Sequence, residues 1–185
     1  MDELNILSKR KSIRSYNEKV VPEPIIDYIV AAAQTSPVAS GRYENYHITM
    51  ITDKSVLDAI EKAFSVKIGS DRKPLYDAPA FAIVSVKAHA EEIENAEYAT
   101  AGMIVHNMVL AAESQGLGAC YIWGVLRVIH DNPLVLAKLD LPEGFVPVGG
   151  MVFGYTDEGL VKDENKARAF SINYLKAKTE TTKDL

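Results

Sequence analysis

The chain has 185 residues, 48% of them hydrophobic, which is enough to bury the core of one domain. A net charge of -5 gives no electrostatic reason to expect nucleic acid as a partner. The single cysteine excludes an internal disulfide and favours a reducing compartment. We expect a cytoplasmic protein, because no stretch has the character of a signal peptide or a membrane span.

A basic segment follows a short helix that we expect at residues 2–9. If the segment is extended, Arg10, Ser12 and Arg14 point to the same side, since side chains alternate along a strand. Two guanidinium groups and a hydroxyl on one spot suit a phosphate, because arginine offers paired donors and a permanent charge. The alternative is a solvated basic run at a helix end, where cations are favourable.

Apolar periodicity and the prolines predict the regular elements of the chain. The long helix is apolar on nearly every side, so it belongs inside a protein or in an interface. In chain order, we expect a helix opened by two prolines and ending near Gln34, a strand at Tyr46–Ile51, a helix at Asp53–Ser65, a strand at Ala80–Val86, a long helix from about Glu97 to Gly116, a strand at Ala119–Trp123, a helix from Asp131 to about Leu139 and a strand at Val146–Tyr155.

Common catalytic motifs are missing from the sequence. It contains no phosphate-binding P-loop, no dinucleotide fingerprint, no nucleophile elbow and no histidine pair at metal-ligand spacing. We therefore predict no metal site. Cys120 lies in an apolar strand, which favours an inert buried thiol over a nucleophile.

Several motifs occur in the order found in one known family. Arg-Lys-Ser-Ile-Arg-Ser-Tyr stands at residues 10–16, and Gly-Leu-Gly-Ala-Cys-Tyr-Ile-Trp-Gly at residues 116–124. Leu-Pro-Glu-Gly follows at residues 141–144. This sequence resembles the nitroreductase family of FMN-dependent oxidoreductases from Arg10 to about Arg168. The match is weakest at Ser36–Tyr46, where the usual Asn, Gln and Pro-Trp are replaced.

The resemblance implies an α+β fold, a three-layer sandwich in which helices flank a mostly antiparallel central sheet. It also implies an intertwined homodimer whose central helices face each other, with FMN in two clefts at the interface. We expect one FMN-binding domain at residues 1–176 and a polar tail at residues 177–185.

The resemblance also assigns residues to the cofactor. Ser40 and Arg42 would contribute from the partner subunit, and Arg42 or Lys73 would stabilise negative charge on the reduced flavin. Lys73 as a solvated loop charge is the alternative. The backbone of Ile122, Trp123 and Gly124 would approach the flavin N5, and Gly124 leaves room for that approach. The residues assigned to the phosphate are Arg10, Lys11, Ser12, Arg14, Lys166 and Arg168.

The implied activity is that of an enzyme that takes hydride from NAD(P)H and reduces small acceptors such as nitroaromatics or quinones. One cofactor would serve both half-reactions, so we expect ping-pong kinetics and no catalytic side chain. One alternative is a same-fold FMN enzyme with other chemistry, such as reductive dehalogenation or flavin modification. Another is a non-catalytic flavin-binding dimer.

Overall fold

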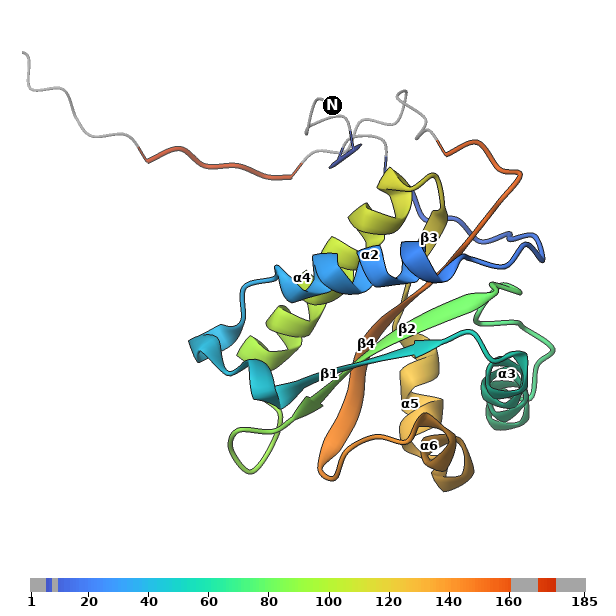
Figure 1. Ribbon diagram of the computed structural model, residues 1–185. Helices are drawn as coiled ribbons and strands as arrows, with labels where there is room; N and C mark the ends of the chain where they lie inside the picture. The colour runs from blue at the N-terminus through green and yellow to red at the C-terminus, as the bar shows by residue number, and fades with distance from the viewer. Residues whose placement is uncertain (1–5, 8–9, 161–169, 176–185) are drawn as a thin grey trace, which may run out of the picture.

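The structure is a computed structural model that describes residues 6–7, 10–160 and 170–175 (Figure 1). Ile6 and Leu7 are the only described residues of the expected first helix, and both are helical. Lys166, Arg168 and the expected tail at residues 177–185 lie outside the described residues. No described helix has the length and apolar character needed to cross a membrane.

The predicted strands and most predicted helices are present, and their ends differ from the expected ends by a few residues at most. The elements are α2 (Glu23–Gln34), the short 3-10 turns η1 (Ala39–Gly41) and η2 (Tyr43–Asn45), β1 (Tyr46–Ile51), α3 (Lys54–Ile68), β2 (Ala80–Lys87), α4 (Asn95–Ser114), β3 (Gly118–Ile122), α5 (Gly124–His130), α6 (Pro133–Leu139) and β4 (Phe145–Gly154).

Helix α5 is the element that the sequence analysis missed. It begins at Gly124, so β3 ends at Ile122 and not at Trp123 as expected. Its buried residues are Val125, Leu126, Val128 and Ile129. These residues lie on one face of a helix, which is typical of a short amphipathic helix. The same spacing of apolar residues in the sequence could have predicted α5.

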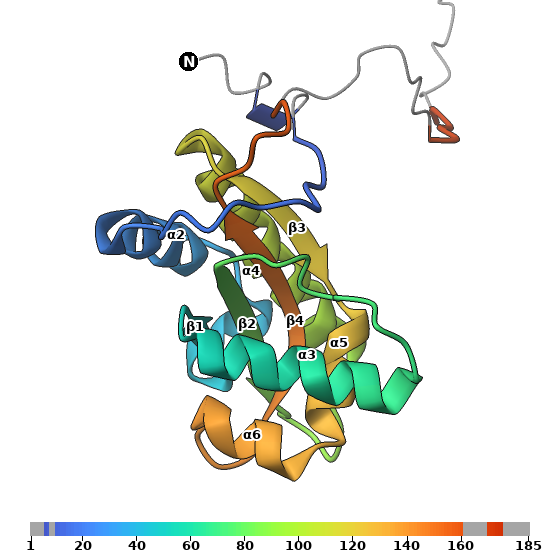
Figure 2. The same cartoon turned by 90° about the vertical axis from the view of Figure 1, so that its right-hand side faces the viewer.

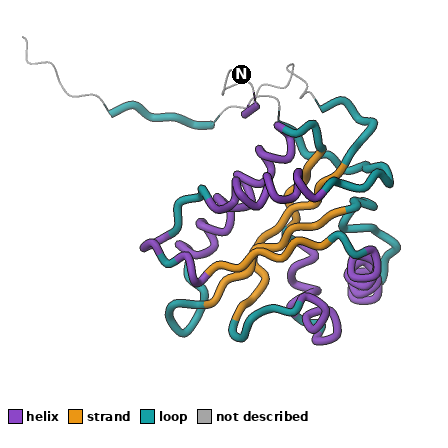
Figure 3. The backbone as a smooth tube through the Cα atoms, in the orientation of Figure 1, coloured by secondary structure: helices purple, strands orange, loops and turns teal. Residues whose placement is uncertain are grey.

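The four strands form one sheet in the order β1-β2-β4-β3, and all three neighbouring pairs are antiparallel. Helices α2 and α4 cover one face, and α3, α5 and α6 cover the other (Figures 1 and 3). Alternate residues of β2 serve the two cores: Ala82 and Val84 pack on the α2–α4 side, and Phe81 and Ile83 on the other. The predicted three-layer α+β architecture is confirmed.

Helix α4 is the central helix of the first layer. Glu94 and Glu97 form a capping box at its N-terminus, which satisfies backbone N–H groups that have no partner within the helix. Most of its apolar residues are buried against the sheet and α2. One stripe along the helix stays at least partly exposed, and it comprises Ala99, Gly102, Met103, His106, Leu110 and Glu113.

The N-terminal segment extends the sheet beyond β3. Ser12 forms a parallel bridge with Ala119, and the Ile13 N–H donates to the Ala119 carbonyl at 2.9 Å. Ile13 is buried, and a Cβ on Gly118 would lie 2.8 Å from its Cγ2 atom. The segment then passes the end of the sheet toward α2 (Figure 2). Gly118 therefore permits the close packing that holds the segment in place.

Substituting Gly118→Ala should destabilise the protein by about 1–3 kcal/mol, because the new methyl group would overpack against Ile13. Urea unfolding measures the change. Gly159→Ala is the matched control, because nothing lies within 4 Å of its Cβ position. Equal unfolding midpoints for the two variants would show that the contact with Ile13 is not tight.

Candidate functional site

Arg10, Ser12 and Arg14, called the arginine cluster below, all influence the Cys120 thiol on β3. Burial raises the pKa of the Cys120 thiol, whereas the charge of Arg14, a hydrogen bond with Ser12 and the charge of Arg10 lower it. Lys11 points elsewhere and its Nζ lies 3.9 Å from a Glu158 carboxylate oxygen.

Arg10 carries a donor that lacks an acceptor. Its Nη1 is buried and has no hydrogen-bond partner among the described residues. Such a group is unfavourable unless a ligand or water satisfies it, because its solvation is lost on folding. A guanidinium with a buried donor that the described residues leave without an acceptor fits the phosphate of FMN.

Arg14 lies against the loop that precedes β2. Its guanidinium carbon is 5.9 Å from the centre of the Tyr76 ring, and a hydrogen bond with Tyr76 raises the pKa of Arg14. Lys73, in the same loop, forms an ion pair with Asp77. It lines a pocket of about 720 Å³ whose lining does not include Arg10, Ser12 or Arg14. The structure therefore does not bring Lys73 into the arginine cluster.

The junction of β3 and α5 carries three further predicted residues. Ile122 is buried in the core beneath α5. Trp123 is 48% exposed, and its ring lies 3.5 Å from where a Cβ on Gly149 would stand. The Cβ position of Gly124 has nothing within 4 Å, so the backbone here is open to close approach.

Ser40 and Arg42 lie at the opposite end of α4 from Arg10. The Ala39 N–H donates to the Thr100 hydroxyl near the start of α4, whereas Arg10 interacts with Glu113 near its end. At 1.5 Å per residue these two points are roughly 20 Å apart. Within one chain, Ser40 and Arg42 therefore lie far from Arg10.

Three residues beside Arg10 were not assigned to the site from the sequence. The Arg10 guanidinium carbon lies 5.7 Å from the centre of the Tyr121 ring. His106 Nδ1 shares a hydrogen bond with the Tyr121 hydroxyl. Burial raises the pKa of Glu113 to about 7, although the Arg10 charge and the Lys11 N–H both lower it. No sequence spacing links these residues, because α4 and β3 bring them together only in the fold.

Residues 7–155 match the nitroreductase family. A protein of Methanothermobacter thermautotrophicus, provisionally named an NADH dehydrogenase/NAD(P)H nitroreductase, is 30% identical over 159 residues, covering 85% of this chain and 79% of that protein. The NADPH-dependent oxidoreductase of Staphylococcus aureus is 28% identical over 178 residues, covering 88% of this chain and 66% of that protein, slightly under two thirds.

A solved structure is similar over nearly the whole chain. It is the crystal structure of a nitroreductase with bound FMN from Bacteroides fragilis, with a TM-score of 0.81 and 26% sequence identity. The alignment covers 95% of this chain and 100% of that chain.

Substituting Glu113→Gln should stabilise the flavin-free protein at pH 8 but have little effect near pH 5. The folded protein binds the Glu113 proton more tightly than the unfolded chain, whose ordinary pKa is 4.5. The contribution of Glu113 to the free energy of unfolding therefore falls as pH rises from 4.5 to about 7. We expect the substitution to raise the free energy of unfolding at pH 8 by no more than about 1 kcal/mol, because solvent screens a half-exposed carboxylate.

Urea unfolding at the two pH values measures this difference. Glu91→Gln, which replaces an exposed carboxylate, is the control and should show no such pH dependence. A Glu113→Gln effect of the same size at pH 5 and pH 8 would contradict the raised pKa.

Proposed function

Because the chain belongs to the nitroreductase family, we propose that it is an FMN-dependent oxidoreductase that uses NAD(P)H to reduce small oxidised acceptors. Nitroaromatics and quinones are the acceptors we favour. The observation that carries the proposal is the arginine cluster at β3, in which Arg10 has a buried donor that no residue of the described part of the chain accepts.

The residues of the chain hold the cofactor, whereas FMN, when bound, supplies the hydride chemistry at its N5 atom. In this proposal Arg10, Ser12 and Arg14 bind the phosphate, and their charges compensate its negative charge. Lys166 and Arg168 are further phosphate residues that the family resemblance implies, whereas Lys11, which it also implies, points toward Glu158.

The junction of β3 and α5 would hold the ring system. The open Cβ position of Gly124 allows a flavin edge to approach main-chain N–H groups at the start of α5, which have no partner within the first turn of a helix. Arg42 is the better candidate for stabilising negative charge on the reduced ring, because Lys73 is already paired with Asp77.

The decisive test is the absorption spectrum of the purified protein under anaerobic conditions, before and after adding NADH or NADPH. Flavin bands that bleach on addition are the expected result, and initial rates with a quinone should then show ping-pong patterns. Bands that persist would redirect the function toward another donor or a binding role. A colourless protein that fails to bind added FMN would remove the proposal.

We further propose that two copies pair through the exposed stripe of α4. The stripe is mostly apolar, and Met103 at its middle is 40% exposed. It runs from the end near Ser40 to the end near Arg10, so pairing offers a way to bring these ends together across two subunits.

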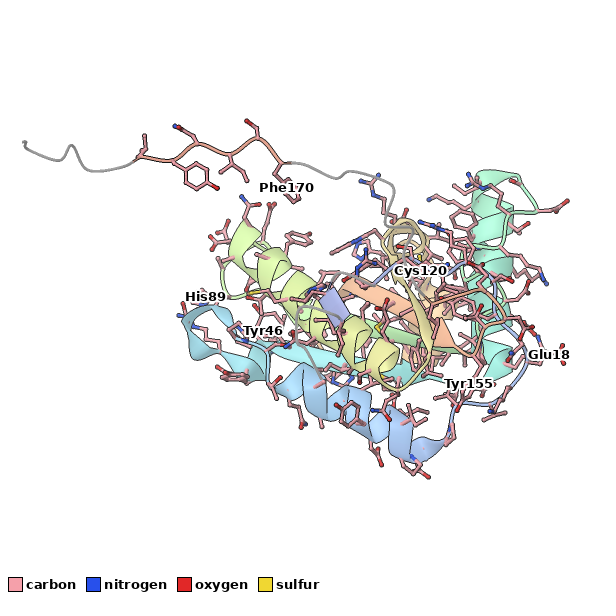
Figure 4. The ribbon with its side chains drawn as sticks, turned by 90° about the horizontal axis from the view of Figure 1, so that it is seen from above. Glu18, Tyr46, His89, Cys120, Tyr155 and Phe170 are labelled. Atoms are coloured by element: carbon pink, nitrogen blue, oxygen red, sulfur yellow. The ribbon has the colours of Figure 1, made fainter. Side chains whose placement is uncertain are left out.

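The apolar residues of segment 170–175 are also exposed, and Phe170 stands apart from the domain (Figure 4). Apolar surface of this kind is typical of an interface.

Substituting Met103→Glu should shift the protein from dimer to monomer and weaken FMN binding at least about tenfold, because a charge in an apolar interface loses its solvation. Analytical ultracentrifugation and FMN titration measure the two effects. Val66→Glu on α3 is the control, since Val66 is 77% exposed on another face. A Met103→Glu protein that remains dimeric would place the interface elsewhere.

A further inference from the structure

The guanidinium of Arg10 rests on an aromatic ring. Its central carbon lies 5.7 Å from the centre of the Tyr121 ring, within the range of a cation–π interaction. Tyr121 belongs to β3, directly before the junction with α5, and its side chain packs on the α4 side of the sheet. The ring is thus a fixed support for a long side chain that would otherwise sample several rotamers.

The Tyr121 ring is itself held by helix α4. Its hydroxyl shares a hydrogen bond with His106 Nδ1, and the two rings are stacked with centres 6.2 Å apart and an interplanar angle of 14°. Burial and the Arg10 charge lower the pKa of His106, and burial raises the pKa of Tyr121. Both shifts favour the uncharged form, so the hydrogen bond joins two neutral side chains.

We propose that Tyr121 and His106 are positioning residues that hold the Arg10 guanidinium ready for the FMN phosphate. This inference rests on the proposed function. Tyr121 supports the cation from one side, and Glu113 attracts it from the end of α4. Ordering an arginine before the ligand arrives lowers the conformational entropy lost on binding, so affinity for the phosphate increases.

Comparing FMN with riboflavin isolates the phosphate, because the two flavins share the ring and the ribityl chain. Titration of the flavin-free full-length protein gives both dissociation constants. Tyr121→Leu, which removes the ring, should weaken FMN binding about threefold to thirtyfold. Tyr121→Phe and His106→Leu, which remove the hydrogen bond, should weaken it about twofold to tenfold. Riboflavin binding should change less than about twofold in all three, because the effect acts through the phosphate.

His106→Asn should restore FMN binding relative to His106→Leu. Its amide oxygen can stand near the position of Nδ1 and accept from the Tyr121 hydroxyl. Tyr28→Phe, at an exposed tyrosine on α2, is the control and should leave both affinities unchanged. A merely structural role would weaken FMN and riboflavin equally, and that result would overturn the inference.

Arg10→Ala separates this inference from the proposed function. It should abolish most of the preference for FMN over riboflavin. If it does, and the Tyr121 and His106 variants keep the wild-type preference, the positioning role is wrong and the phosphate site stands. If Arg10→Ala keeps the full preference, the phosphate assignment itself fails, and the positioning role fails with it.

Discussion

The packing of Ile13 against Gly118 is the contact on which the rest of the candidate site depends. It fixes an extended N-terminal segment beside β3, and the Ile13 N–H secures the register through the Ala119 carbonyl. Because side chains alternate along an extended chain, burying Ile13 turns the side chains of its neighbours Ser12 and Arg14 away from the side that Ile13 occupies. A single buried side chain thus helps to set the direction of the residues on either side of it.

Patterns within short stretches predicted most of the fold. Period-two alternation located β1, continuous apolar runs located β2 and β4, and the unusually apolar α4 was expected at the centre. The failure at α5 has a local cause. Four of the five residues that follow Gly124 are apolar, so this stretch continues the apolar character of β3. Only the position of Arg127 distinguishes a helix from a longer strand.

The candidate site was less accessible from the sequence. The alternation of Arg10, Ser12 and Arg14 is a local pattern, so it can be stated as an expectation from the sequence alone. The contact of His106 with Tyr121 joins a helix to a strand, and the ion pair that occupies Lys73 depends on how one loop is folded. Neither of these two contacts corresponds to a recognisable residue spacing in the sequence. The distance between Ser40 and Arg10 is likewise a property of the length of α4.

Trp123 gives the molecule a built-in optical reporter. It is the one tryptophan in the sequence, and its half-exposed indole stands at the junction of β3 and α5. Emission excited at the long-wavelength edge of the protein absorption, where tyrosine absorbs little, therefore originates almost wholly at this junction, with no background from other indoles. A light-absorbing ligand settling there would dim that emission, whereas the same ligand bound at a remote surface would leave it much brighter.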